Sequence, residues 1–365
     1  MKLHMQSPAG PRTVFNGRTY DYFSGCGYLG LQGHPDVIAA AVEALQKYGI
    51  STATSRGSYG EHAIYDELER EACAFFGTER CLYFPSGYMG PAVLAQACRG
   101  EYDHIFIDSS SHYSLWDAAQ GAGKPITPFH HLNPGHLEEG LRRELLPAER
   151  PLILSDGVFP VSGEIAKLPD YLALARQYGG MVILDDAHAS GVLGESGRGT
   201  ADHFAIGDPC CRSCTTLSKA LGGCGGLVCG DAGWIDAADH ASSVCAGASP
   251  PPLPLAAASA RALMIARVDP GLRHRLRENV AQARAGFRAL GWELEDTPVP
   301  ILCLGAGNGM DLARIKELLF KEGIAITHER SYPSTPPGGA LRIAIFATHT
   351  PDQVQRLLDA VGRAI

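Results

Sequence analysis

The chain has 365 residues, a length typical of about two domains. With 31 Lys and Arg residues against 39 Asp and Glu residues, the formal net charge is −8. This acidic balance argues against a protein that binds nucleic acids or anionic membranes over a broad surface. No apolar run reaches the roughly 18 residues needed to span a bilayer, and residues 1–8 lack the apolar stretch of a secretory signal. The hydrophobic fraction of 45% predicts a globular protein with a large core.

The eleven cysteines are too few for a disulfide scaffold in a chain of this length. Cys81 and Cys229 lie inside apolar segments, where a thiol packs as a small hydrophobic group. Cys210, Cys211 and Cys214 resemble part of a metal site, but no second Cys or His pair follows at a suitable spacing. We therefore expect reduced thiols, no metal site and a cytoplasmic protein.

Residues 36–252 alternate short apolar segments with helical stretches such as Ala63–Phe76 and Leu168–Tyr178. Strands are expected at Arg80–Phe84, His104–Asp108, Pro125–Phe129, Pro151–Ser155, Met181–Asp185, Ser213–Leu217 and Gly226–Gly230. This alternation predicts an α/β domain with a mostly parallel sheet of seven strands. The strands are apolar throughout, so we expect helices to cover both faces of the sheet.

The composition changes at Ser249–Pro254, where four prolines within five residues interrupt the α/β pattern. The expected elements after this point are helices at Ala256–Arg267 and Gly271–Leu290, strands near Val299–Leu304, Ile324–Thr327 and Leu341–Phe346, and a closing helix from Pro351. We therefore expect an N-terminal segment at 1–35, a large α/β domain at 36–252 and a small α+β domain at 253–365.

Polar residues follow four of the expected strands at their carboxyl ends, where an open α/β sheet forms its ligand crevice. Ser86–Tyr88 opens a helix whose free N–H groups can bind phosphate, although, taken alone, an ordinary helix cap at Ser86 explains it better. His112 follows the next strand. Asp185 ends another strand, where an unpaired buried carboxylate is costly unless a cation meets it. Lys219 is flanked by small residues, and desolvation there would make its amine nucleophilic; the alternative is a surface lysine.

In combination, these features predict a site for pyridoxal 5′-phosphate (PLP). Lys219 would form the Schiff base, and a carboxylate would hold the pyridine nitrogen protonated so that the ring accepts negative charge. A helix N-terminus with hydroxyl groups would bind the phosphate, and a flat side chain would cover the ring. Each feature is weak alone, and the prediction rests on their coincidence.

From about Tyr22 to the C-terminus, the sequence resembles the α-oxoamine synthases, a group of fold-type I PLP enzymes. The most specific motifs are Asp185-Asp186-Ala187-His188 and Thr216-Leu217-Ser218-Lys219, about 30 residues apart. Supporting motifs are Tyr28-Leu29-Gly30-Leu31, Ser55-Arg56-Gly57 with Gly60 and His62, Ser86-Gly87-Tyr88, Ser111-His112, Asp156-Gly157-Val158-Phe159, Gly197-Arg198-Gly199, and Leu341-Arg342-Ile343 with His349-Thr350.

The resemblance implies a PLP-dependent acyltransferase that condenses an amino acid with an acyl thioester, commonly with decarboxylation. It also implies a homodimer with the active site at the subunit interface. Lys219 matches the Schiff-base lysine, and Asp185 matches the partner of the pyridine nitrogen. His112 resembles the histidine that stacks on the ring, and His188 the one that bonds near the ring oxygen and the substrate.

The remaining family positions concern the phosphate and the substrate. Ser86, Gly87 and Tyr88 match the phosphate loop, and Thr216 matches its hydroxyl contact. Arg342 resembles the guanidinium that binds the amino-acid carboxylate, a task suited to a bidentate fork. The alternative for Arg342 is a strand arginine on a solvated face.

Three positions depart from the family pattern. Cys26 stands where an asparagine near the substrate carboxylate is usual, Pro160 replaces a serine beside the ring oxygen, and Pro91 replaces an asparagine after the phosphate loop. The cofactor anchors are therefore retained while the substrate side loses polar groups, which leaves a changed acyl donor or reaction open. Alternatives are an aminotransferase or carbon–carbon lyase on the same fold, or a catalytically idle partner subunit. The amino acid, the acyl chain and the thiol carrier stay open.

Overall fold

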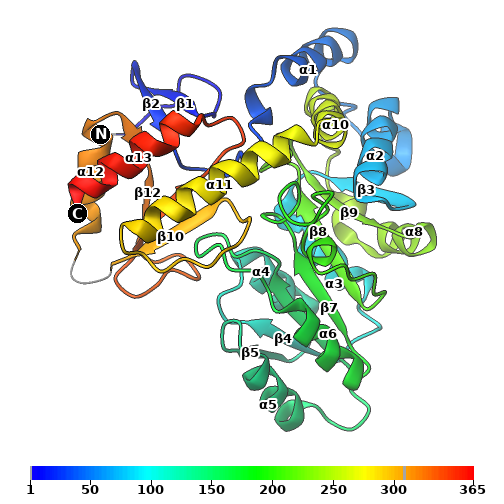
Figure 1. Ribbon diagram of the computed structural model, residues 1–365. Coiled ribbons are helices and arrows are strands. Elements are labelled where there is room, and N and C mark those ends of the chain that lie inside the picture. The colour runs from blue at the N-terminus through cyan, green and yellow to red at the C-terminus, as the bar shows by residue number, and fades with distance from the viewer. Residues whose placement is uncertain (1, 307–309) are drawn as a thin grey trace.

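The computed structural model describes residues 2–306 and 310–365 (Figure 1). Its central element is a seven-stranded sheet with the order β3-β9-β8-β7-β6-β4-β5. The strands are β3 (Arg80–Phe84), β4 (His104–Asp108), β5 (Ile126–Phe129), β6 (Pro151–Asp156), β7 (Met181–Asp185), β8 (Cys211–Thr216) and β9 (Gly226–Gly230). The strands from β4 to β8 are mutually parallel, whereas β9 is antiparallel to both of its neighbours. The predicted α/β sheet is therefore confirmed.

Helices cover both faces of this sheet, because successive side chains of a strand point to opposite faces. Leu82 and Phe84 pack on one face with helices α3, α4 and α8, whereas Phe106 and Val182 pack on the other with α5 and α6. The helices of the large lobe are α1 (Pro35–Tyr48), α2 (Ala63–Phe76), α3 (Gly90–Ala97), α4 (Tyr113–Ala122), α5 (Pro134–Glu144), α6 (Leu168–Gln177), α7 (Thr200–His203), α8 (Ala232–Ala241) and α9 (Ser243–Gly247).

Two three-stranded sheets form a smaller lobe. One joins β1 (Arg12–Phe15), β2 (Arg18–Tyr22) and β11 (Ile324–Ala325), and the other joins β10 (Ile301–Gly305), β13 (Ala340–Ala344) and β12 (Thr327–Glu329). The expected strand at Ile324–Thr327 is thus divided between both sheets. The N-terminal strands join the C-terminal part of the chain because β2 pairs in parallel with β11, a long-range pairing that a sequence pattern does not report.

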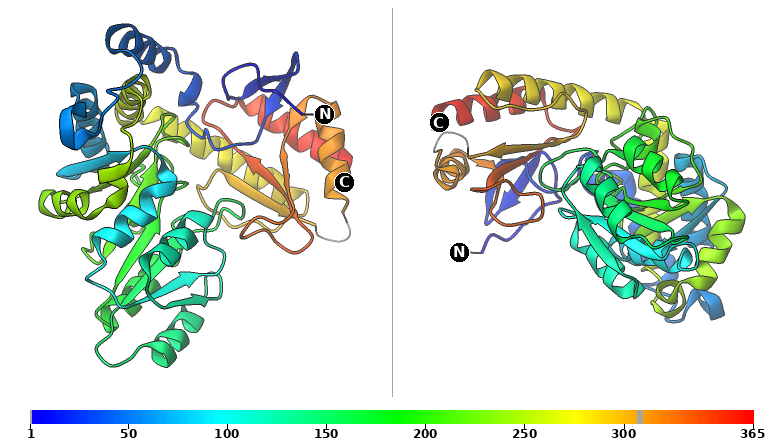
Figure 2. Two further views of the ribbon diagram at one scale, coloured as in Figure 1. Left: turned by 180° about the vertical axis from the view of Figure 1, so that it is seen from behind. Right: turned by 90° about the horizontal axis from the view of Figure 1, so that it is seen from below.

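Long helices connect the two lobes. Helix α10 (Leu253–Val268) packs on α1 and α2 in the large lobe, and α11 (Gly271–Ala289) packs on α13 (Pro351–Ala364) in the small lobe. Figure 2 shows the two chain ends in the same lobe, with α12 (Leu312–Lys321) beside them. The proposed domain division at residue 253 thus precedes a helix that still contacts the large lobe.

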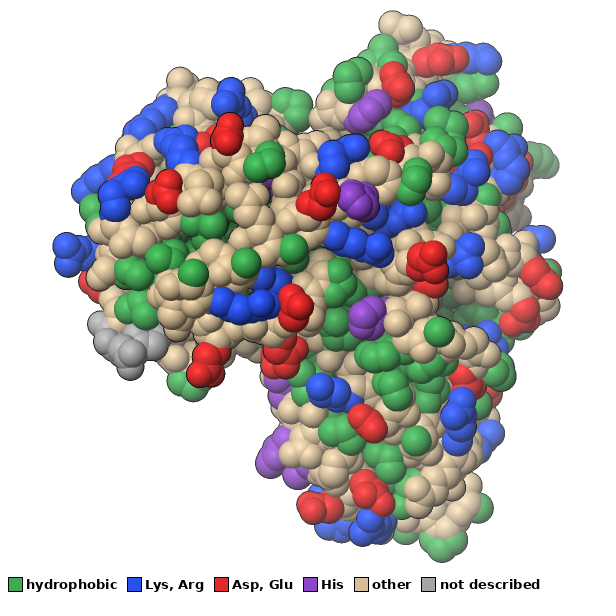
Figure 3. Space-filling model, viewed as in Figure 1, with side chains coloured by type: hydrophobic (Ala, Val, Ile, Leu, Met, Phe, Trp, Pro, Cys, Tyr) green, Lys and Arg blue, Asp and Glu red, His purple; other side chains and the backbone are tan. Residues whose placement is uncertain are grey.

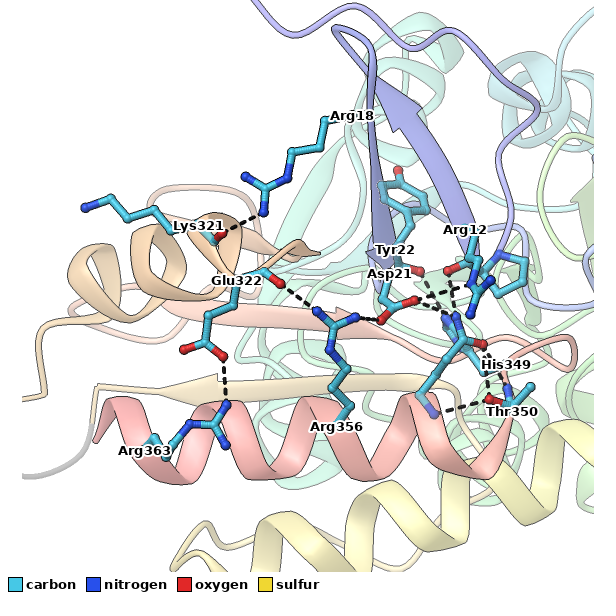
Figure 4. Close-up of polar contacts among 12 residues, drawn as sticks. Arg12, Arg18, Asp21, Tyr22, Lys321, Glu322, His349, Thr350, Arg356 and Arg363 are labelled. Atoms are coloured by element: carbon cyan, nitrogen blue, oxygen red, sulfur yellow. Dashed lines mark hydrogen bonds and ion pairs between the residues drawn. The ribbon is translucent and has the colours of Figure 1, made fainter.

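A buried carboxylate fastens the N-terminal hairpin to the last helix (Figure 4). Asp21 on β2 pairs with Arg356, accepts a 2.8 Å hydrogen bond from Gln353 Nε2, and lies 3.9 Å from Arg12 Nε. His349, just before α13, places Nε2 3.0 Å from the carbonyl oxygen of Tyr22, and burial lowers its pKa to about 4. These contacts fix the chain that runs from β2 into the site described below.

The surface carries no broad field of one sign on the face seen in Figure 3, where acidic and basic side chains are interspersed. Within residues 2–306 and 310–365, no helix is long and apolar enough to cross a membrane. All eleven cysteines are free thiols, and the Sγ atoms of Cys81 and Cys229 lie 3.2 Å apart across β3 and β9. Among the described residues, no cluster of three or more His, Cys, Asp or Glu side chains is arranged to hold a metal ion.

Candidate active site

The carboxyl ends of the parallel strands bring the predicted residues to one edge of the sheet. His112 follows β4, Asp185 ends β7, and Lys219 follows β8, and these three strands run in the same direction. Two antiparallel pairings, β3 with β9 and β9 with β8, place the loop Ser86–Tyr88 after β3 at this same edge. An open α/β sheet binds ligands at this edge.

Ser114 lies between the carboxylate at the end of β7 and the histidine that follows β4. Asp185 is buried; its Oδ1 accepts from Ala187 N at 3.0 Å, and its Oδ2 accepts from Ser114 Oγ at 3.3 Å. Ser114 Oγ lies 2.8 Å from His112 Nδ1. The carboxylate is therefore held in one orientation, with its charge next to an aromatic ring.

The His112 ring is fixed as a helix cap. Nδ1 of His112 accepts from Ser114 N at 3.1 Å at the start of α4, and its backbone N donates to Asp156 Oδ2 at 2.8 Å. Burial lowers the pKa of His112, and the charge of Lys219 lowers it further, whereas the nearby Asp185 raises it. Burial and the neighbouring Asp185 raise the pKa of Asp156 well above its ordinary value. Because its pKa is lowered, the His112 imidazole is neutral at physiological pH.

His188 lies at the junction between the sheet edge and the N-terminal segment. The side chain is buried, and Nδ1 lies 2.7 Å from the hydroxyl of Tyr28. Burial lowers the pKa of His188 well below its ordinary value, and the nearby charges of Lys219 and Arg342 lower it further. A neutral imidazole of this kind can exchange hydrogen bonds without carrying charge.

Lys219 is half-buried, three residues beyond the end of β8. Its carbonyl oxygen accepts from Gln32 Nε2 at 2.6 Å and from Gly222 N at 3.1 Å, which closes a tight turn. Among the described residues, the side-chain amine has no hydrogen-bond or ion-pair partner. The backbone is thus held firmly while the amine stays available.

The loop after β3 approaches Thr216 closely. A Cβ atom at Gly87 would lie 2.4 Å from Cβ of Thr216 and 2.6 Å from its Oγ1, so only glycine fits here. Oγ1 of Thr216 donates to Gly225 O at 3.1 Å and lies 2.8 Å from Ser218 Oγ. Ser86 Oγ accepts from Tyr88 N at 3.3 Å and caps a short 3₁₀ turn, Gly87–Met89. Hydroxyl and N–H groups therefore converge at one point.

Arg342 on β13 reaches this edge from the small lobe. The side chain is buried; Nε donates to Pro160 O at 2.6 Å, and Nη1 donates to Gly25 O at 3.0 Å. Nη2 lies 3.4 Å from Tyr28 Oη and 3.7 Å from Cys26 Sγ. The guanidinium is therefore not on a solvated face. It does not present the free bidentate fork that the sequence suggests, because backbone carbonyls and neighbouring side chains occupy most of its donors.

His131 supports the loop whose Pro160 carbonyl accepts the hydrogen bond from Arg342. His131 Nδ1 lies 2.9 Å from Asp108 Oδ1, and Nε2 lies 3.0 Å from Glu164 Oε2. Burial lowers the pKa of His131, but the bonds to Asp108 and Glu164 outweigh burial and raise it to about 9. The ring also packs edge-on against Phe159, with centroids 4.3 Å apart. This His131 clamp fixes the loop that contains Pro160.

Four side chains at this edge received no role from the sequence: Tyr28, Ser114, Asp156 and Tyr332. Asp156 could have been found, because it ends a buried strand as Asp185 does. Ser114 follows His112 by two residues at a helix start, which is a capping signal. Tyr28 and Tyr332 carry no such signal, because their positions depend on contacts between segments that are far apart in sequence.

A cavity of about 570 Å³ lies elsewhere, between α2, α8 and the edge strand β3. Among the residues that line it are Arg56, Glu61 and Glu69, and Arg56 makes ion pairs with both carboxylates. Neither Lys219 nor Asp185 lines this cavity. The predicted chemistry therefore belongs to the sheet edge.

The residues at the sheet edge fit PLP. Glycine at position 87 lets the loop lie against Thr216, which brings the start of the 3₁₀ turn and the Thr216 hydroxyl together, as a phosphate site requires. A fixed carboxylate, a flat imidazole and an amine stand around the same point, as a pyridinium aldehyde requires. Ser111 Oγ is buried without a hydrogen-bond partner within the described residues. Asp185, His112, Lys219, Thr216 and Gly87 would hold the cofactor.

Comparisons with known proteins agree with this arrangement. Residues 25–361 match the family Aminotransferase class I and II. The chain is 34% identical over 359 residues to 8-amino-7-oxononanoate synthase of Thioalkalivibrio sulfidiphilus, covering 97% of this chain and 91% of that protein. It is 33% identical over 357 residues to 8-amino-7-oxononanoate synthase of Thermoanaerobacter pseudethanolicus, covering 98% and 90%. The structure of serine palmitoyltransferase from S. paucimobilis with bound PLP and myriocin superimposes with a TM-score of 0.91 at 28% identity, covering 100% and 92%.

Proposed function

The chain belongs to the class I and II aminotransferase family and, within it, to the α-oxoamine synthases, and on this premise we propose how its own residues carry out the family reaction. The protein is a PLP-dependent acyltransferase that condenses an amino acid with an acyl thioester. The observation that carries the assignment of roles is the meeting of Asp185, His112 and Lys219 at one sheet edge. This reading is favoured over transamination or lyase chemistry because the similar full-length relatives are synthases.

The large lobe supplies the cofactor side of the reaction. When bound, PLP supplies an electron-accepting ring that stabilises negative charge on the α-carbon of the amino acid. Asp185 would keep the ring nitrogen protonated, and its orientation by Ala187 N and Ser114 Oγ suits that task. Lys219 would hold the cofactor through its side-chain amine, and the same amine would take the proton from the α-carbon of the amino acid. His112 would cover the ring face as a neutral imidazole.

The phosphate side depends on backbone and hydroxyl groups. Ser86, Gly87 and Tyr88 would offer N–H and hydroxyl donors at the start of the 3₁₀ turn. Thr216 would add its hydroxyl, which lies where a Cβ at position 87 would collide. His188 would bond near the ring oxygen through its imidazole, held by Tyr28 Oη.

The small lobe and the N-terminal segment supply the amino-acid side. Arg342 would bind the carboxylate through Nη1, which has a second hydrogen beyond the one given to Gly25 O. A single charge-assisted contact replaces the bidentate fork expected from the sequence, because Gly25 O and Pro160 O hold the other donors. Cys26 would line this subsite, since its Sγ lies 3.7 Å from Nη2 of Arg342.

The proposal includes assembly as a homodimer and a reduced, cytoplasmic location. Helix α1 supports a partner surface, because Ile38, Val42 and Leu45 each keep 45–47% of their area exposed at helical spacing. The free thiols of all eleven cysteines support a reducing compartment. Light scattering at several protein concentrations tests the dimer, and a monomer at all of them would contradict it.

The first experiment is a near-visible absorbance spectrum of the protein with PLP, before and after each of a panel of amino acids. We expect a band from lysine-linked cofactor that shifts with one amino acid and does not convert to the pyridoxamine form. A panel of acyl-CoA compounds then tests thiol release. Conversion to pyridoxamine phosphate would favour the aminotransferase alternative. Absence of any cofactor band after PLP addition would contradict the proposed function.

A further inference from the structure

Tyr332 of the small lobe packs against His112 of the large lobe. Tyr332 lies in the loop between β12 and β13, and its ring centroid is 6.1 Å from that of His112. The same ring meets Tyr113 edge-on at 5.5 Å. Tyr332 therefore spans the two lobes at the site where the cofactor ring would lie.

The phenol of Tyr332 is positioned as a free donor. Tyr332 is half-buried, and none of the described residues makes a hydrogen bond with its hydroxyl. Burial raises the pKa of Tyr332 to about 12, and the neighbouring Asp156, Tyr113 and Cys26 side chains add to this shift. The hydroxyl is thus protonated at neutral pH, close to both the sheet edge and the Cys26 segment.

We propose that Tyr332 is a further catalytic residue, whose O–H donates a hydrogen bond to the carbonyl oxygen of the acyl thioester. The inference rests on the proposed function and adds a residue to it. A guanidinium suits the amino-acid carboxylate, whereas a neutral O–H suits a carbonyl oxygen that becomes negative as the reaction proceeds. Nearby, Pro160 has no N–H and Cys26 is only a weak donor. Neither residue can therefore supply this donor, whereas Tyr332 carries a free O–H.

The step is balanced without an additional reactant. A bond forms between the α-carbon of the amino acid and the acyl carbon, while the electron pair of the carbonyl moves onto oxygen. The pair then returns, the C–S bond breaks, and the thiol leaves with the proton that was removed from the α-carbon. Tyr332 keeps its own proton throughout and stabilises only the charge on oxygen.

Two related ligands isolate this contact. Octanoyl-CoA carries the carbonyl, and its thioether counterpart S-octyl-CoA lacks it. Calorimetry on the PLP-loaded protein without amino acid measures both dissociation constants while no turnover occurs. We expect the wild type to prefer octanoyl-CoA by about fivefold, the usual contribution of one neutral hydrogen bond, and Tyr332→Phe to lose that preference. Tyr113→Phe is the matched control, because it removes a neighbouring exposed phenol and should keep the preference.

Turnover gives the second readout. Tyr332→Phe keeps the ring contacts with His112 and Tyr113, so its melting temperature should match the wild type. We expect kcat to fall by about 10²-fold, as when one oxyanion donor is removed, with an unchanged KM for the amino acid. A Tyr332→Phe protein with wild-type kcat or an intact preference for the carbonyl would overturn the inference alone. If the wild-type protein releases no thiol from any acyl-CoA, the proposed function is wrong, and the inference that rests on it is wrong as well.

Discussion

The two halves of the active site are built in different ways. In the proposed site, the cofactor half comes from the carboxyl ends of parallel strands in one sheet: His112 follows β4, Asp185 ends β7, and Lys219 follows β8. The substrate half joins Cys26 from the N-terminal segment to Arg342 and Tyr332 from the small lobe, more than 300 residues away. The first half therefore depends on local strand geometry, and the second on the docking of distant segments.

Two of the three departures from the family pattern lie around Arg342. The most specific motifs of the α-oxoamine synthase pattern lie at strand ends of the single sheet. Two of the three departures, Cys26 and Pro160, touch Arg342 through Sγ or a backbone carbonyl, and the third, Pro91, lies at the start of α3. A change in the substrate half can alter what binds there while the sheet keeps the cofactor in place. The following variants test whether the two halves separate in this way.

The largest effect is expected in the cofactor half. Lys219→Ala removes the only covalent anchor proposed for PLP, so the near-visible band should vanish and kcat/KM should fall by on the order of 10³-fold or more. Absorbance after dialysis and a thiol-release assay measure both. Lys316→Ala, at an exposed position of α12, is the control and should keep the band. A band that persists in Lys219→Ala would reject the site assignment.

In the substrate half, we expect a smaller effect that changes only the affinity for the amino acid. Arg342→Ala removes a charge-assisted hydrogen bond, so KM for the amino acid should rise by about ten- to a hundredfold while the cofactor band is retained. Titration of the band with the amino acid measures the affinity. Arg363→Ala, an exposed arginine paired with Glu322, is the control. An unchanged affinity in Arg342→Ala would remove Arg342 from the site.

The His131 clamp between the halves should make stability depend on pH. The pKa of His131 is raised to about 9 in the folded protein, above its ordinary value of 6.5, so its stabilisation is complete below about pH 6.5 and is lost as pH rises through 9. The pKa of Glu164 is lowered, so the stabilisation that the Glu164 carboxylate contributes is lost as the pH falls into the acid range. We expect the clamp to contribute about 1–3 kcal/mol after solvent screening.

Calorimetric melting at pH 6 and pH 9.5 tests the clamp. The melting temperature of the wild type should be higher than that of His131→Gln at pH 6, and this difference should be smaller at pH 9.5. His274→Gln, at an exposed histidine of α11, provides the matched control with no such trend. A constant difference between wild type and His131→Gln across this range would show that His131 is not charged in the folded protein.

The smallest effect concerns the small lobe alone. Thr350 and Gln353 form a reciprocal capping box at the start of α13, so Thr350→Ala should lower the free energy of unfolding by about 1 kcal/mol. Urea denaturation measures this loss, and Thr350→Ser should restore most of it. The near-visible band should be unaffected, because Thr350 touches none of the cofactor residues. A weakened band in Thr350→Ala would show that the halves are coupled more tightly than their contacts suggest.

The sequence alone predicted the central sheet, which the structure confirms, and the residues proposed to hold the cofactor. Strands β4, β6 and β7 are mostly apolar and each ends in an aspartate, and parallel strands place their carboxyl ends at one edge. That local rule brings Lys219 and Asp185 together without knowledge of any other contact. Strand bounds such as Cys211–Thr216 shifted by one or two residues because pairing, and not the apolar run, ends a strand.

Only the tertiary structure decided the substrate half. The parallel pairing of β2 with β11, and the bonds from Asp21 to α13, place the segment after β2 beside Arg342. The occupied donors of Arg342, the His131 clamp and the reach of Tyr332 to His112 all depend on such contacts. No periodicity records them, because the residues are far apart in sequence and meet only after the two lobes have packed.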